Sequence, residues 1–265
     1  MLLSYNSIIK EGHMRLIIIY LLTFSVFAND YFPDDNWEAR DGSSLGLDEA
    51  KIDKLFKLTF EDSATMSAVL IKDGYIVKEK HAKGFDKNSY GTSWSTAKSF
   101  YAALIGISLD KGEIQSLDEP VGNYIDSYNR DGKEDITIRQ ILNMTSGLEF
   151  PSHEHEMMFF EENHLEYALE VGVESTPGEK FQYNNVNSML MGEILKSATG
   201  KTAKELIEER IFSQIGIRDY TAWEDSAGHT LTYCCLDMSA RDYSKFGLLF
   251  SRDGRWNDNQ IISED

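Results

Sequence analysis

The spacing of apolar and polar positions predicts a mixture of helices and a few strands. Apolar residues recur three and four positions apart over residues 48–58, 95–109, 185–199, 203–212 and 239–250, which is the spacing of helices. Residues 113–143 also favour helix. Two β-rich runs, 66–71 and 75–81, flank Lys72-Asp73-Gly74, and Asp-Gly between such runs is a hairpin signal. The chain therefore predicts an α+β fold.

The helix that starts near Ser95 carries the first candidate chemistry. Residues 99–109 are apolar on nearly every face, so this helix is expected to be central and buried. Ser95 and Lys98 are three residues apart and would share one face. A serine hydroxyl needs a neighbouring base to become a nucleophile, and a lysine whose pKa is lowered by burial can act as that base. Ser-x-x-Lys is short enough to occur by chance, so the motif alone is only a hypothesis.

A second candidate stretch precedes the helix over residues 185–199. Pro177 and Gly178 form a turn signal, and Tyr183 and Asn185 follow at positions that would face the same side of an extended segment. Both side chains could therefore face a cleft. The alternatives are that Asn185 caps the helix and that Tyr183 packs at an edge.

Residues 151–163 form an irregular stretch rich in Met, Phe, His and Glu. His153-Glu154-His155-Glu156 could hold a metal, but the spacing is not that of His-Glu-x-x-His, and a solvated loop is favoured. No metal and no cofactor is predicted. The aromatic residues of this stretch could instead border a substrate cleft.

Charge and cysteine content narrow the possible partners. The chain has 44 acidic and 26 basic residues, a net charge of −18, which argues against binding to nucleic acid. Its two cysteines, Cys234 and Cys235, are adjacent. Since the side chains of neighbouring residues usually diverge, we expect half-buried thiols rather than a disulfide, and no metal or redox role.

The N-terminal residues are typical of a secretory signal peptide. Met14-Arg15 precedes an apolar run over residues 16–27, too short to span a bilayer, and small residues end at Ala28. Residues 1–13 would be an upstream extension, and an uncleaved anchor is the alternative. Cleavage after Ala28 would leave a single domain, 29–265, with 237 residues and a net charge of −19. We expect a secreted or periplasmic protein without a stable membrane partner.

Two motifs that follow one another along the chain are less likely to occur by chance than either motif alone. Ser95-x-x-Lys98 and Tyr183-x-Asn185, together with residues 138–148, 177–185 and 238–247, resemble the β-lactamase-related serine hydrolases. That group includes class C β-lactamases, penicillin-binding D-Ala-D-Ala carboxypeptidases, carboxylesterases and 6-aminohexanoate-dimer hydrolases. Residues 93–99 and 231–235 look closest to its nylon-oligomer-hydrolase and esterase members.

The resemblance implies a fold and a set of roles. It implies a β-lactamase/transpeptidase-like fold, with an antiparallel sheet flanked by helices, a mainly helical lobe, and a cleft between them. Ser95 would be the acylated nucleophile, with its backbone N–H as half of an oxyanion hole, and Lys98 its base. Tyr183 would relay the proton, and Asn185 would hold Lys98 or a substrate carbonyl. The substrate would be a small ester or amide.

One departure from the pattern concerns the end of the chain. Family members carry Lys or His, a small residue and Gly on a late strand, whereas here residues 200–203, Gly-Lys-Thr-Ala, do not match and lie at a helix boundary. We therefore expect the C-terminal strands to be missing. Two other functions stay open: a catalytically inactive penicillin-binding-like protein that holds a peptide-like ligand, and a metal-dependent hydrolase using His153 and His155.

Overall fold

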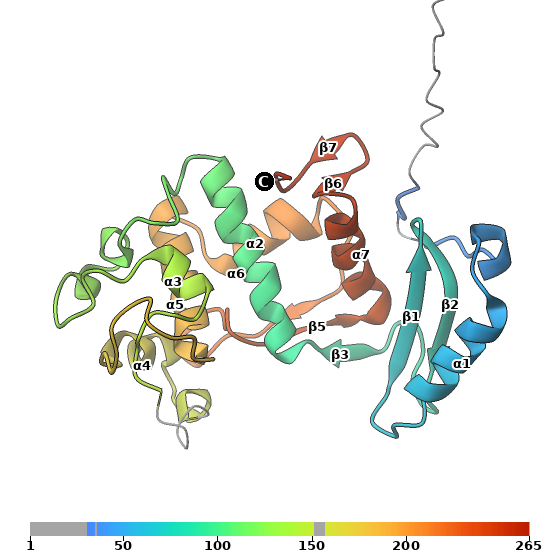
Figure 1. Ribbon diagram of the computed structural model, residues 1–265, viewed down its shortest axis with the longest axis horizontal. Helices are drawn as coiled ribbons and strands as arrows, with labels where there is room; N and C mark the ends of the chain where they lie inside the picture. The colour runs from blue at the N-terminus through green and yellow to red at the C-terminus, as the bar shows by residue number, and fades with distance from the viewer. Residues whose placement is uncertain (1–30, 35, 151–156, 265) are drawn as a thin grey trace, which may run out of the picture. The chain divides into compact units, whose positions relative to one another are not determined.

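A computed structural model describes residues 31–34, 36–150 and 157–264, and its core surrounds helix α2 (Ala97–Asp110). Helices α5 (Asn185–Thr199) and α6 (Ala203–Ile207) pack against α2 (Figure 1). Phe100 of α2 is 1% exposed, and its ring stacks on that of Phe246 with centroids 3.6 Å apart. The apolar faces of α2 are therefore covered, as the sequence predicts.

The other helices begin at side-chain caps, which explains why their starts can be predicted. A polar side chain before each helix accepts a hydrogen bond from a backbone N–H of its first turn. The capping residues are Asp48 for α1 (Glu49–Thr59), Thr137 for α3 (Ile138–Leu142), Asn163 for α4 (His164–Glu170), Thr202 for α6 and Ser239 for α7 (Ala240–Ser251). A π-helical turn, Glu208–Phe212, continues α6. Helices predicted at 48–58, 203–212 and 239–250 are confirmed.

The predicted hairpin is also present. Strands β1 (Ser67–Lys72) and β2 (Tyr75–His81) pair antiparallel. The turn residues Asp73 and Gly74 have φ of 54° and 86°, the positive values that a two-residue turn of this kind requires. Helix α7 packs on β1, and the Arg241 guanidinium donates to both carboxylate oxygens of Glu79 at 2.8 and 2.6 Å. The hairpin is thereby fixed to the remainder of the described fold.

Three further pairings join short strands. Strand β5 (Leu236–Ser239) lies between β3 (Tyr90–Thr92) and β4 (Thr221–Ala222), and β6 (Arg255–Trp256) pairs with β7 (Asn259–Gln260). All are antiparallel. The sequence gives no convincing signal for these strands, each of which has two to four residues. In the described residues the antiparallel pairing is divided among three small sheets rather than one.

The helical prediction for residues 113–143 is wrong over most of its length. Between Gly112 and Thr137, a stretch that is fully described, the backbone forms turns and two short 3-10 helices, Val121–Asn123 and Asp126–Asn129. Pro120 cannot donate a backbone hydrogen bond, and Gly132 has a φ of 81°. These residues break the chain into turns, and only α3 remains of the predicted helix.

Candidate functional site

Ser95 lies in a short turn that leads into α2. The turn, Trp94–Thr96, is a 3-10 helix, and the α-helix itself starts at Ala97. Ser95 is exposed, whereas Ala97 is fully buried. On the upstream side, the Ser93 N–H donates to the Leu236 carbonyl at 2.8 Å, and the Leu236 N–H donates to Ser93 Oγ at 2.9 Å. The turn is thus held between β5 and the core.

Two polar groups converge on the Ser95 hydroxyl. Lys98 Nζ donates to Ser95 Oγ at 3.0 Å, and the Tyr183 hydroxyl donates to the same oxygen at 2.6 Å. Lys98 Nζ also lies 5.1 Å from the centroid of the Tyr183 ring. Ser95, Lys98 and Tyr183, which the sequence singles out, therefore meet at one atom.

Burial and hydrogen bonding change the acidity of both partners. Burial lowers the pKa of Lys98, and hydrogen bonding and charge interaction with Tyr183 only partly oppose that effect. Burial raises the pKa of Tyr183, but hydrogen bonds with Ser95 and Lys98 and the lysine charge outweigh it, so the pKa lies below its ordinary value. A larger fraction of each group is thus deprotonated near neutral pH, and so able to accept a proton, than for the same side chain in water.

The Tyr183 segment is positioned by the turn that follows α3. The Gln182 N–H donates to the Met144 carbonyl at 2.9 Å, and the Gly178 N–H donates to the Thr145 carbonyl at 2.7 Å. At Gly147 φ is 74°, and an added Cβ would lie 2.1 Å from the Ser175 carbonyl oxygen. Only glycine fits this close approach. Residues 144–147, which belong to one of the stretches that resemble the hydrolases, therefore position the segment that carries Tyr183.

The structure corrects the capping alternative for Asn185. The residue that caps α5 is Asn184, whose Oδ1 accepts from the Val186 N–H at 2.9 Å, while Asn185 is the first helical residue. The Asn185 Oδ1 atom is buried, with no hydrogen-bond partner among the described residues. A buried acceptor without a partner needs an explanation, and a hydrogen bond with Lys98 or with a ligand would supply one. Its role in holding either one stays a prediction.

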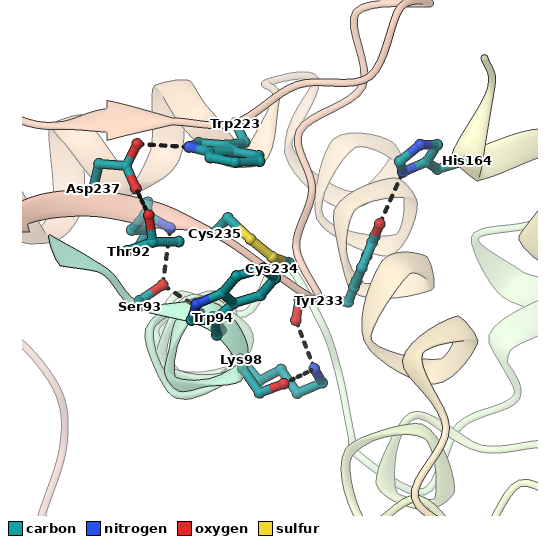
Figure 2. Close-up of a disulfide and its surroundings, with 12 residues drawn as sticks. Thr92, Ser93, Trp94, Lys98, His164, Trp223, Tyr233, Cys234, Cys235 and Asp237 are labelled. Atoms are coloured by element: carbon teal, nitrogen blue, oxygen red, sulfur yellow. Dashed lines mark hydrogen bonds between the residues drawn. A yellow bond between two sulfur atoms is a disulfide. The ribbon is translucent and has the colours of Figure 1, made fainter. Parts of the chain in front are cut away.

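Lys98 has a second hydrogen-bond acceptor that the sequence does not predict. Its Nζ donates to the backbone carbonyl of Tyr233 at 2.6 Å (Figure 2). The ring of Tyr233 lies 5.8 Å from the same nitrogen. Because the acceptor is a main-chain atom, residue type gives no signal for it. Only the likeness of residues 231–235 to known hydrolases could have drawn attention to this segment.

The prediction of half-buried thiols is wrong. Cys234 and Cys235 form a disulfide with each other, directly after Tyr233 (Figure 2), and are 4% and 0% exposed. Cys235 has a φ of 129°, which turns the backbone so that the two side chains lie on the same side. The argument that neighbouring side chains diverge assumes an ordinary extended or helical backbone, which this segment lacks.

The proposed metal ligands His153 and His155 lie outside the described residues. Among the residues that the structure does describe, no three His, Cys, Asp or Glu side chains are close enough together to hold a metal ion. Part of the predicted cleft-bordering stretch is described: Phe160 is 75% exposed, and the Phe159 ring lies 6.2 Å from that of His164. Over the described residues, no helix combines the length and apolarity needed to cross a membrane.

The chain is similar in sequence to known proteins. Residues 52–262 match the beta-lactamase family. A D-aminopeptidase of Brucella anthropi is 25% identical over 178 residues, 61% of this chain and 33% of the relative. An uncharacterized protein of Alkalihalophilus pseudofirmus is 21% identical over 230 residues, 76% of this chain and 62% of that protein. The chain thus spans less than two thirds of these curated relatives.

The structural comparison confirms the predicted fold. A solved structure from Bacillus anthracis, described as a 6-aminohexanoate-dimer hydrolase, superposes with a TM-score of 0.72 at 24% identity. The match covers 78% of this chain and 59% of that one. The chain has the same α+β, β-lactamase/transpeptidase-like fold.

Proposed function

Because the chain belongs to the beta-lactamase family, we propose that it is a serine hydrolase that cleaves an ester or amide bond through an acyl-enzyme on Ser95. The observation that carries the proposal is the convergence of Lys98 and Tyr183 on Ser95 Oγ, at 3.0 and 2.6 Å. A nucleophile within hydrogen-bond reach of two groups whose pKa values are lowered meets the geometric requirement for activation.

The first step would be acylation. Ser95 Oγ attacks the substrate carbonyl carbon while its proton passes to the neutral Lys98 amine or to Tyr183. The C=O electron pair moves onto oxygen, and the Ser95 backbone N–H is expected to donate to that oxyanion. As the pair returns, the bond to the leaving group breaks. Tyr183 then delivers the proton to the departing nitrogen or oxygen.

The second step would regenerate the enzyme. Water attacks the acyl carbon, and its proton passes to Lys98 or Tyr183. Tyr183, which protonated the leaving group as an acid in the first step, acts as a base in this one. The Ser95 oxygen departs and regains its proton. Asn185, whose buried Oδ1 has no partner among the described residues, would hold Lys98 or the substrate during these steps. The substrate class proposed is a small ester or amide.

Labelling with a fluorophosphonate tests the proposal. The intact mass should rise by one adduct, and peptide mass spectrometry should place it on Ser95. Ser95→Ala should remove the adduct, while Ser99→Ala, at another exposed serine nearby, should keep it. An unlabelled wild-type chain, or an adduct that survives Ser95→Ala, would contradict the acyl-enzyme and favour a binding protein with the same cleft.

We also propose that the chain is exported after removal of residues 1–28. The support is the cationic start at Arg15, the apolar run over 16–27 and the small residue Ala28. N-terminal sequencing of protein recovered outside the cytoplasm should begin at Asn29. Recovery of residues 1–28 in the membrane fraction, still joined to the domain, would show an uncleaved anchor instead.

A further inference from the structure

Tyr233 has both of its polar ends engaged. Its backbone carbonyl accepts from Lys98 Nζ at 2.6 Å, and its hydroxyl lies 3.0 Å from Nδ1 of His164 (Figure 2). Tyr233 and His164 are each 4% exposed. Tyr233, a buried residue, thus links Lys98 at its backbone end to His164 at its hydroxyl end.

A second hydrogen bond holds the backbone of His164. Its backbone N–H donates to Asp225 Oδ2 at 2.9 Å. The side chain of Asp225 is 0% exposed, and its other oxygen accepts from the N–H groups of Ala227 and His229 at 3.0 and 2.8 Å. The bond from His164 thus anchors the start of α4 to a buried carboxylate that two further N–H groups hold in place.

Burial favours the neutral form of His164 over the charged form. Burial lowers the pKa of His164, and His229 adds to this effect, while Asp225 and Glu161 oppose it. Burial also raises the pKa of the Tyr233 hydroxyl, which therefore keeps its proton. In the tautomer that carries the imidazole proton on Nε2, the tyrosine is the donor and Nδ1 the acceptor. Loss of this bond would leave a buried polar atom unpaired on each side.

We propose that His164 is a positioning residue that, through Tyr233, holds the carbonyl that orients the Lys98 amine toward Ser95. This inference rests on the proposed function. His164 does not contact Ser95 or Lys98 in the structure, so it acts only through the tyrosine. Neighbouring anchors limit the effect: Thr232 Oγ1 donates to the Ser188 carbonyl at 2.7 Å, so the segment would shift and not detach.

The inference makes a specific claim about acidity. A carbonyl that accepts from the ammonium form of lysine stabilises that charged form. If the Tyr233 carbonyl moves away, the pKa of Lys98 falls further. A change that affected only general packing would lower the amount of folded protein, but it would not move the pH at which the lysine titrates.

The test measures the rate of fluorophosphonate labelling of Ser95 as a function of pH in three variants of the full chain. His164→Leu and Tyr233→Phe remove the two ends of the bond, while His164→Asn keeps an acceptor near the position of Nδ1. We expect the first two to label roughly fivefold to fiftyfold more slowly, in line with a small misplacement of a catalytic group. Their rate should rise at a lower pH than in wild type, and His164→Asn should recover most of the rate.

The control is His81→Gln, at a part-buried histidine of β2 that hydrogen-bonds Ser67 at 2.9 Å. It should label at the wild-type rate with the wild-type pH midpoint. If His164→Leu does not fold, Tyr233→Phe still decides, because it removes one oxygen and keeps the ring. Unchanged rates and midpoints in Tyr233→Phe, or equal losses in His164→Leu and His164→Asn, would overturn the inference. Labelling that persists in Ser95→Ala would instead overturn the proposed function.

Discussion

Removing the Lys98 amine and the Tyr183 hydroxyl together tests whether these groups act as one unit. Both donate to Ser95 Oγ, at 3.0 and 2.6 Å, and the lowered pKa of Tyr183 depends in part on Lys98. Lys98→Ala therefore also raises the pKa of Tyr183 and reduces the fraction of Tyr183 that is deprotonated and able to accept a proton. Tyr183→Phe removes the group that shares the proton with Lys98. Each change disables the same transfer.

The expected magnitudes follow from that shared oxygen. A positioned proton-transfer group contributes about 10²–10⁴-fold to a rate, so two independent groups would lose about 10⁴–10⁸-fold together. Groups that act as a unit are strongly non-additive, and the double variant should then lose little more than the worse single one. The predicted loss for Lys98→Ala with Tyr183→Phe is thus about 10²–10⁴-fold.

The assay is the pre-steady-state acylation of Ser95 by a chromogenic short-chain ester, with Ser95→Ala as the background. Thermal unfolding of each variant checks that the fold is kept. Losses that multiply fully would refute the argument, since they would mean that Lys98 and Tyr183 work in separate steps.

Three further changes test the packing that supports the site. Phe100→Ala should cost about 3–5 kcal/mol of unfolding free energy in chemical denaturation, because the ring is buried against Phe246, whereas Phe250→Ala, at a half-exposed ring, should cost less. Gly147→Ala should lower both stability and the rate of Ser95 acylation, while Gly84→Ala, also at positive φ but in open space, should affect stability alone. The hydrogen bond from Arg241 lowers the pKa of Glu79 in the folded protein. The pair therefore stabilises the fold fully above the pKa that the carboxyl group has in the unfolded chain, and this stabilisation is lost as pH falls through its pKa in the folded protein. Arg241→Met should remove that part of the acid dependence, and an unchanged acid unfolding curve would contradict it.

The sequence predicts best what depends on neighbours along the chain. Ser95 and Lys98 meet because helical spacing places them on one face, and the Asp73-Gly74 turn follows from the positive φ that both residues tolerate. Strands β3 and β5 are different, since Thr92 pairs with Asp237, far away in the chain. Runs of three or four residues carry too little alternation to reveal such a pairing.

The parts of the site that escape prediction act through main-chain atoms or through burial. Tyr233 serves Lys98 with its carbonyl, which every residue type has. His164 is reached only through the Tyr233 hydroxyl, so nothing in its own surroundings along the chain marks it. Tyr183 is a third case. The sequence assigns it a role only through the resemblance to the β-lactamase-related serine hydrolases, because its spacing from Ser95 along the chain gives no signal.

The turn at Trp94 shows why local propensity alone does not place Ser95, the proposed nucleophile. Trp94 has a φ of 46°, a left-handed conformation that costs a bulky residue about 1–2 kcal/mol. Such a conformation persists only where the surroundings determine it more strongly than local preference does. Here the two hydrogen bonds between Ser93 and Leu236 fix one side, and the fully buried Ala97 fixes the other. The Ser95 hydroxyl is thus aimed by contacts with β5 and the core, and helical periodicity sets only its distance from Lys98.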